Sequence, residues 1–177
     1  MPGPAARHNN RSMAEISKSN LLQTAPGIPT TKDACVVIVK TEWNAAIVDA
    51  LEAGARAELI KAGADVRVIT VPGAFEIPFG IRAYWDAHKY KDDRPGAFIA
   101  LGCVLRGDTP HFEYVCRAVT DGVLQLNMTL PIPTIFGILT VDNQQQADER
   151  IGGRHGNKGE EAGITALKMI AVKKSFQ

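Results

Sequence analysis

The sequence has few cysteines, almost no net charge and no long hydrophobic run, and each shortage excludes a class of protein. Its three cysteines, Cys35, Cys103 and Cys116, lie in apolar surroundings without the spacing of a metal site. They predict buried, reduced thiols in a cytoplasmic protein. The net charge of +1 gives no basic field for nucleic acid or an anionic membrane surface. No stretch approaches the roughly 20 apolar residues that cross a bilayer, so no membrane span is predicted.

What is present is enough apolar sequence for one ordinary core. Hydrophobic residues make up 45% of the 177 residues, which fits a single globular domain. The beginning of the chain differs, because it is polar and rich in proline and glycine. We predict a mobile tail over residues 1–30 and one ordered domain over residues 31–177.

Four apolar runs predict β-strands. The first, ACVVIVK, has the β-branched composition of a strand that is buried on both faces. Because helical patterns alternate with these runs, the expected fold class is α/β. We expect a single three-layer domain, in which a four-stranded parallel sheet carries helices on both faces, with flavodoxin-like topology. The strands are expected at residues 34–40, 66–71, 97–105 and 132–140.

The intervening segments have helical spacing. Apolar residues recur at every fourth position over residues 47–59, and similar patterns predict helices at 76–88 and 112–126. Two further helix starts carry a capping signal. Asn143 and Asn157 are each followed three residues later by Gln or Glu, as in a capping box.

The segments that follow the strands carry an unusual set of side chains. In open α/β sheets, ligands gather at the carboxyl ends of the strands. Aromatic rings, a carboxylate, an imidazole and a helix N-terminus at that edge suit a flat polar ring with a phosphate attached. The segments are KTEWN, PGAFEIP, RGDTPHF and the end of the fourth strand, expected at Phe136-Gly137.

These residues also have structural explanations. Trp43 could simply pack at the start of a helix, and Phe75 and Phe136 could belong to the core. Glu76 could only complement a helix dipole, Gly107 could serve turn geometry alone, and His111 could be a structural polar group. Capping of the helix after the third strand is the specific alternative for Asp108 and Thr109. The residues with such alternatives are Trp43, Phe75, Glu76, Gly107, Asp108, Thr109, His111 and Phe136.

A second concentration of charge lies in ERIGGRHGNKGEE, residues 149–161. It holds Arg150, Arg154 and Lys158 among four glycines. Lys158 stands at the start of a predicted helix, where the helix dipole disfavours a cation, and a bound anion or polarised carbonyl would explain it. The alternative is a flexible connector with solvated charges. The segment follows no predicted strand and has glycine after its lysine, so it is not a phosphate-binding P-loop.

Four motifs carry a family resemblance by their order and spacing. They are VPGAFEIPF (71–79), LGCVLRGDTPHFEYVC (101–116), PTIFGILT (133–140) and QADERIGGRHGNKGEEA (146–162). With them the chain resembles the 6,7-dimethyl-8-ribityllumazine synthase family over roughly residues 32–176. The resemblance implies a transferase of riboflavin biosynthesis. That enzyme condenses 5-amino-6-(D-ribitylamino)uracil with 3,4-dihydroxy-2-butanone 4-phosphate and releases phosphate and water, without a metal or redox cofactor.

The resemblance also implies roles for individual residues. His111 resembles the proton-transfer residue of the family, and Trp43 the aromatic residue that stacks on the pyrimidine ring. Phe136 resembles a residue supplied by a neighbouring subunit. The ring and ribityl chain are expected to contact Trp43, Asn44, Ala74, Phe75, Glu76, Val104, Leu105, Phe136 and Lys158. The phosphate is expected to contact Gly107, Asp108, Thr109 and Arg150.

Two positions depart from the family pattern. Asp108 stands where some relatives have a small neutral residue, and a carboxylate would repel phosphate. We therefore expect Asp108 to act through its backbone or as a helix cap. Arg154 replaces a lysine found in some relatives, which keeps the charge but not the contact geometry. Glu161 matches an acidic position near the site of the family.

The resemblance further implies an assembly of copies. Family members form pentamers with active sites between subunits, and some form hollow shells of sixty subunits. The short segment at 151–158 favours the shell. The expected partners are small-molecule substrates, further copies of the chain and, as one alternative, riboflavin synthase. A non-catalytic riboflavin-binding module and a purely structural cage are the alternative functions.

Overall fold

Four strands pair into one parallel sheet in the computed structural model, which describes residues 34–177. The predicted mobile tail lies outside the described residues. The sheet order is β2-β1-β3-β4 with every neighbouring pair parallel, which confirms the predicted sheet and its flavodoxin-like topology. The strands are β1 (Cys35–Thr41), β2 (Asp65–Val71), β3 (Ala97–Leu105) and β4 (Thr134–Val141).

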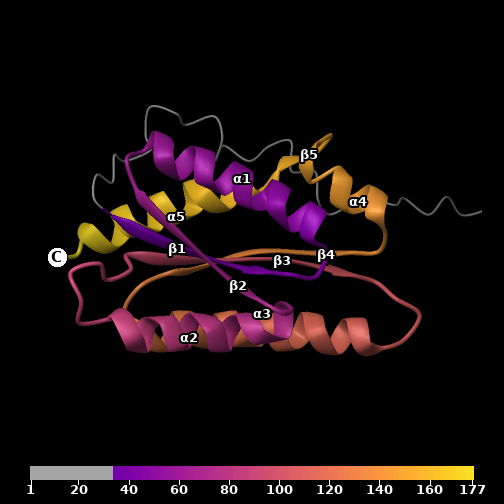
Figure 1. Ribbon diagram of the computed structural model, residues 1–177, viewed down its shortest axis with the longest axis horizontal. Coiled ribbons are helices and arrows are strands. Elements are labelled where there is room, and N and C mark those ends of the chain that lie inside the picture. Colours follow the sequence, from indigo (N-terminus) through magenta and orange to yellow (C-terminus); the bar gives the residue numbers. More distant parts are fainter. Residues whose placement is uncertain (1–33) are drawn as a thin grey trace, which may run out of the picture.

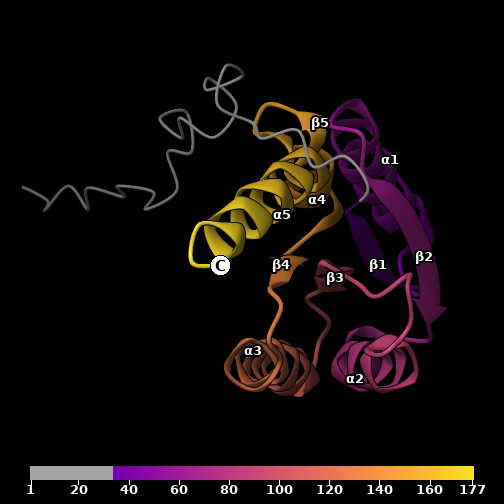
Figure 2. The same cartoon turned by 90° about the vertical axis from the view of Figure 1, so that its left-hand side faces the viewer.

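Helices cover both faces of the sheet, so the molecule has the predicted three layers. Figures 1 and 2 show α1 and α5 on one face and α2 and α3 on the other. Each face buries its own apolar cluster, because alternate side chains of β1 and β3 point in opposite directions. The helices are α1 (Ala45–Lys61), α2 (Ile77–His88), α3 (His111–Thr129), α4 (Gln144–Asp148) and α5 (Lys158–Lys174). A short 3-10 turn, η3 (Ala74–Glu76), precedes α2.

The segment between α4 and α5 is more ordered than the sequence pattern predicts. It forms a small antiparallel pair, β5 (Ile151–Gly153) with β6 (Gly156–Asn157). Gly152 and Gly156 have φ values of 125° and 69°, a conformation that favours glycine. The alternative of a flexible connector is therefore wrong, because the glycines of this segment build a tight hairpin.

Both predicted capping asparagines are confirmed. Asn143 Oδ1 accepts a hydrogen bond from the Gln146 amide at 2.9 Å, and Asn157 Oδ1 accepts one from Gly159 at 2.8 Å. The reciprocal half of the first capping box differs, because the Gln146 side chain accepts from the Asp142 amide at 2.9 Å.

The start of α5 is pressed directly against α1. A Cβ atom added to Gly159 would lie 1.9 Å from the carbonyl oxygen of Leu51. Only glycine allows this approach, and it fixes the position of the neighbouring Lys158. The location of Lys158, a predicted site residue, thus follows from close packing between two helices.

Candidate functional site

The carboxyl ends of three parallel strands surround a cavity of about 490 Å³. Residues after β1 and β2, the end of β3 and the first turns of α3 meet there, as expected for an open α/β sheet. This volume is within the range of small-molecule sites. We name it the His111 cavity, and its lining residues are Trp43, Asn44, Gly73, Ala74, Phe75, Glu76, Cys103, Val104, Leu105, His111 and Val115.

The aromatic residues of the His111 cavity are exposed to solvent. Trp43 is 73% exposed and Phe75 is 64% exposed. Within the chain, the alternatives that Trp43 packs at the start of a helix and that Phe75 belongs to the core are therefore wrong. Large apolar rings beside a cavity are available to a flat ligand or to another protein surface.

Asn44 is held in a special conformation at this edge. It is the one residue other than glycine between 34 and 177 with a positive φ, at 58°. Its side-chain amide donates to the carbonyl oxygen of Cys103 at 2.8 Å, which ties the loop after β1 to the end of β3. Asn tolerates the left-handed region better than most residues. Asn44 thus shapes the cavity before any ligand binds.

Three lining residues, Gly73, Cys103 and Val115, were not among the predicted site residues. A Cβ atom added to Gly73 would lie 3.0 Å from Glu76 Oε2 and 3.8 Å from Trp43 Cδ1. The Pro-Gly pair after the second strand was the available sequence signal for this close approach. Burial raises the pKa of the Cys103 thiol to about 11, so it is protonated at neutral pH and unsuited to nucleophilic attack.

The turn between β3 and α3 leaves the helix start open. Pro110 occupies the N-cap position with helical φ and ψ angles, and it makes no side-chain capping bond. Neither Asp108 nor Thr109 makes a side-chain hydrogen bond to any residue between 34 and 177. The alternative that Asp108 or Thr109 caps α3, and the capping role expected for Asp108, are therefore wrong. Gly107, Asp108 and Thr109 are exposed beside the positive end of the helix dipole.

The remaining predicted site residues line a different cavity, of about 560 Å³, along β4. Phe136 lies in the middle of β4 rather than at its end, and it is 42% exposed. We name this the Arg150 cavity. Its lining residues are Asn127, Pro133, Thr134, Ile135, Phe136, Gly137, Ile138, Leu139, Thr140, Val141, Arg150, Lys158, Glu161, Ala162, Thr165 and Met169.

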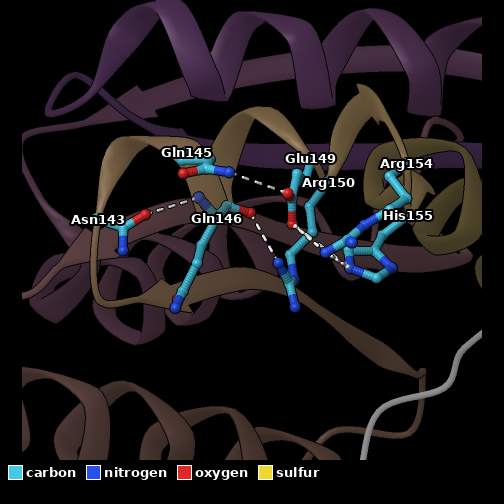
Figure 3. A network of polar contacts seen from close by, with 7 residues as sticks. All are labelled: Asn143, Gln145, Gln146, Glu149, Arg150, Arg154 and His155. Carbon is cyan, nitrogen blue, oxygen red and sulfur yellow. Dashed lines mark hydrogen bonds and ion pairs between the residues drawn. The ribbon is translucent and has the colours of Figure 1, made fainter. Parts of the chain in front are cut away.

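Arg150 lines the Arg150 cavity and has no acidic partner among the described residues. Its Nη1 donates to the carbonyl oxygen of Gln146 at 2.8 Å, as Figure 3 shows. Among the described residues it forms no salt bridge, whereas the neighbouring Arg154 pairs with Glu149 at 3.1 Å. A guanidinium has five N–H donors, so Arg150 keeps donors and a full charge for an anion.

Lys158 forms an ion pair within the chain, so a bound anion is not needed to explain a cation at the start of α5. Its ammonium lies 2.6 Å from Glu161 Oε1, and the two side chains are 15% and 18% exposed. This carboxylate offsets the cost of a cation at the start of a helix. The position of Lys158 alone is thus not evidence for a bound anion.

One chain therefore holds two groups of predicted site residues. Trp43 and His111 share one cavity, and Arg150, Lys158 and Phe136 line the other. Between residues 34 and 177, no three His, Cys, Asp or Glu side chains are grouped so as to hold a metal ion. No helix in the same range has both the length and the apolar character needed to span a membrane.

Comparison with known proteins agrees with the motifs. The family model for 6,7-dimethyl-8-ribityllumazine synthase matches residues 33–174. A protein of that name from Phocaeicola vulgatus is 46% identical over 85% of this chain and 88% of its own length. Those from Bacteroides fragilis and Cytophaga hutchinsonii are 49% and 45% identical, over 75% and 86% of this chain and 92% and 94% of theirs. The chain therefore belongs to the 6,7-dimethyl-8-ribityllumazine synthase family.

Proposed function

We propose that this chain catalyses the reaction for which its family is named. It joins the amine of 5-amino-6-(D-ribitylamino)uracil to the ketone of 3,4-dihydroxy-2-butanone 4-phosphate. Imine formation and ring closure each release water, and the phosphate departs by elimination. The observation that carries this proposal is the pair of cavities described above, one with aromatic rings and an imidazole and the other with an unpaired guanidinium.

The His111 cavity is suited to the pyrimidine and its ribityl chain. Exposed Trp43 and Phe75 offer faces for a planar ring. Glu76 and the free side-chain oxygen of Asn44 can accept hydrogen bonds from ribityl hydroxyls. The lining also includes Ala74, Val104 and Leu105, which contribute apolar contact at the edge of the ring.

The phosphate is assigned to the start of α3 and to Arg150. Gly107, Asp108 and Thr109 offer backbone N–H groups next to an uncapped helix start, which attracts anions. The free donors of Arg150 can bind two phosphate oxygens at once.

His111 is assigned to proton transfer. It is the first residue of α3, is exposed, and makes no side-chain hydrogen bond to the described residues. An imidazole can take and return protons near neutral pH as the imine forms and phosphate leaves. The remaining rate acceleration is assigned to orientation, because the site holds both substrates next to each other.

We further propose that one active site combines the His111 cavity of one copy with the Arg150 cavity of the next. The two cavities are separate within one chain, so a second copy has to bring Arg150, Lys158 and Phe136 to the first copy's His111. A head-to-tail contact of this kind gives a closed ring when the rotation between copies divides a full turn, and we propose that it does so here. The exposed rings of Trp43 and Phe75 support such a contact.

Mixing two impaired variants tests this arrangement, in an assay with the phosphate substrate far below the KM expected for R150A. H111A and R150A are each purified, then dissociated and reassembled together in equal amounts. If sites are shared between copies, about one quarter of the sites in a random head-to-tail ring keep both residues, so the mixture recovers about one quarter of wild-type activity. Lumazine absorbance and released phosphate are measured. If the mixture is no more active than the average of its two components, His111 and Arg150 do not meet across a subunit contact.

The same assay separates the alternative functions. A non-catalytic riboflavin-binding module would bind a lumazine without forming it, and a structural cage would do neither. For the assembly we propose a pentamer, and a sixty-subunit shell as its higher form, with riboflavin synthase as a candidate partner. Light scattering distinguishes the two sizes. The three free cysteines support a reducing, cytoplasmic location.

A further inference from the structure

Arg106 stands directly before the proposed phosphate turn but is bonded unlike a phosphate ligand. Its Nε lies 2.7 Å from Asp142 Oδ1, and its Nη1 lies 2.5 Å from Glu113 Oε1. The guanidinium also covers the ring of Phe112, with its carbon 4.1 Å from the ring centroid. Two carboxylates thus offset its charge and a ring covers one of its faces. Arg150, by contrast, donates to a neutral carbonyl.

The partners of Arg106 lie on two separate parts of the molecule. Phe112 and Glu113 follow His111 directly in the first turn of α3. Asp142 follows β4 and precedes α4, and the backbone amide of Arg106 donates to the carbonyl oxygen of Val141 at 2.9 Å. Figure 1 shows the β3–α3 loop and α4 at the same end of the molecule. One side chain therefore joins the start of α3 to the end of β4.

The connection continues from Asp142 to Arg150. Gln146 accepts from the Asp142 amide at 2.9 Å through its side chain and from Arg150 Nη1 at 2.8 Å through its carbonyl oxygen. The hydrogen bonds of Arg106 hold the pKa values of Glu113 and Asp142 below their usual range, so both carboxylates are charged at neutral pH. Arg106 therefore faces two charged carboxylates at neutral pH.

We propose that Arg106 is a positioning residue that sets the start of α3, and with it His111, relative to the segment that carries Arg150. It acts through Phe112, Glu113 and Asp142 and does not itself contact substrate. This inference rests on the proposed function, in which His111 moves protons and the adjacent turn holds phosphate. An imidazole and a turn that are free to shift by about 1 Å lose up to about 100-fold in rate.

The test compares R106Q, R106K and D142N with wild type, with both substrates varied. For R106Q we expect kcat to fall between about 10- and 100-fold and KM for the phosphate substrate to rise. KM for the pyrimidine is expected to stay within about twofold, because Trp43 and Phe75 lie on loops that Arg106 does not contact. R106K is expected to recover less than half of the loss on a logarithmic scale, because an ammonium cannot reproduce the planar fork or its stacking.

A double-mutant cycle separates positioning from general stability. If Arg106 acts through Asp142, the variant R106Q/D142N is no slower than R106Q alone. The control is R82Q, which removes an exposed α2 arginine whose Nε lies 2.9 Å from Asp86 and which lines neither cavity. R82Q is expected to keep wild-type kinetics. If R106Q does not assemble, E113Q and D142N each remove one of the two ion pairs, and both are then expected to lower kcat.

The possible failures are distinct. Wild-type kcat in R106Q, multiplied losses in the double variant, or an equal loss in R82Q would each overturn the positioning role. In the fallback case, wild-type kcat in both E113Q and D142N overturns it as well. A wild-type protein that forms no lumazine from the two substrates overturns the proposed function instead.

Discussion

The His111 cavity and the Arg150 cavity use their polar groups in opposite ways. Around His111, the side chains of His111, Glu76 and Thr109 have no hydrogen-bond partner among residues 34–177, and the aromatic rings are exposed. Around Arg150, the charged groups are held in place, by Gln146 for Arg150 and by Glu161 for Lys158. The first cavity thus offers free polar groups and exposed rings, whereas the charged groups of the second are bonded to neighbours. A site built from both would combine adaptable recognition with a preorganised anion contact.

The largest change is expected when His111, the proposed proton-transfer residue of the His111 cavity, is removed. H111A is expected to lower kcat by about 10²–10⁴-fold, the usual contribution of a general acid–base group. Its melting temperature is expected to stay at the wild-type value, because the exposed side chain contributes no hydrogen bond to the described fold. Steady-state lumazine formation and thermal unfolding are measured together. A kcat near wild type would leave the His111 cavity without its chemical role.

Removing Arg150 from the Arg150 cavity is expected chiefly to weaken binding of the phosphate substrate. R150A removes charged donors, which raises KM for the phosphate substrate about 10- to 100-fold. R150K is expected to stay close to R150A, because one ammonium cannot bind two phosphate oxygens in a fork. R154A is the matched control, since the exposed Arg154 already pairs with Glu149. If KM rises for the pyrimidine instead, Arg150 does not serve the phosphate.

Removing an aromatic ring from the His111 cavity is expected to have a smaller effect on kinetics. W43A removes a stacking surface and is expected to raise KM for the pyrimidine about two- to tenfold. W43F keeps a planar ring and is expected to stay near wild type. Product binding, measured by the change in lumazine fluorescence, gives an independent value. Equal KM values in W43A and wild type would show that the exposed indole serves only contact with another copy.

Sequence patterns are sufficient to predict the strands, two helix caps and most of the His111 cavity. The strands, the caps at Asn143 and Asn157, and the convergence of Trp43, Phe75 and His111 follow from local periodicity and from the topology of a parallel sheet. The hairpin of residues 151–157 was missed for a local reason. Its strands are only three and two residues long and contain glycine, so they show no alternation of apolar and polar residues.

Contacts between distant residues also escaped prediction. The approach of Gly73 to Trp43 and the use of Asn44 as a tie to β3 depend on tertiary geometry, which periodicity does not report. The pairing of Lys158 with Glu161 was also missed, although their i,i+3 spacing on a predicted helix was an available signal. The division of the site residues between two cavities follows from where β4 lies in the sheet, at an edge beyond β3.

The smallest change is expected at Asp108, the one carboxylate in the proposed phosphate turn. Its side chain is exposed and caps no helix, so D108N is expected to leave the melting temperature unchanged. Removing a charge that repels phosphate is expected to lower KM for the phosphate substrate about twofold, and the effect is expected to shrink in high salt because exposed charges are screened. KM is measured at low and high ionic strength, with D92N, at an exposed aspartate outside both cavities, as control. A lower melting temperature in D108N would mean that the carboxylate stabilises the turn after all. A higher KM would mean that the Asp108 carboxylate contacts substrate. The backbone N–H groups of the helix start would then not suffice to bind the phosphate.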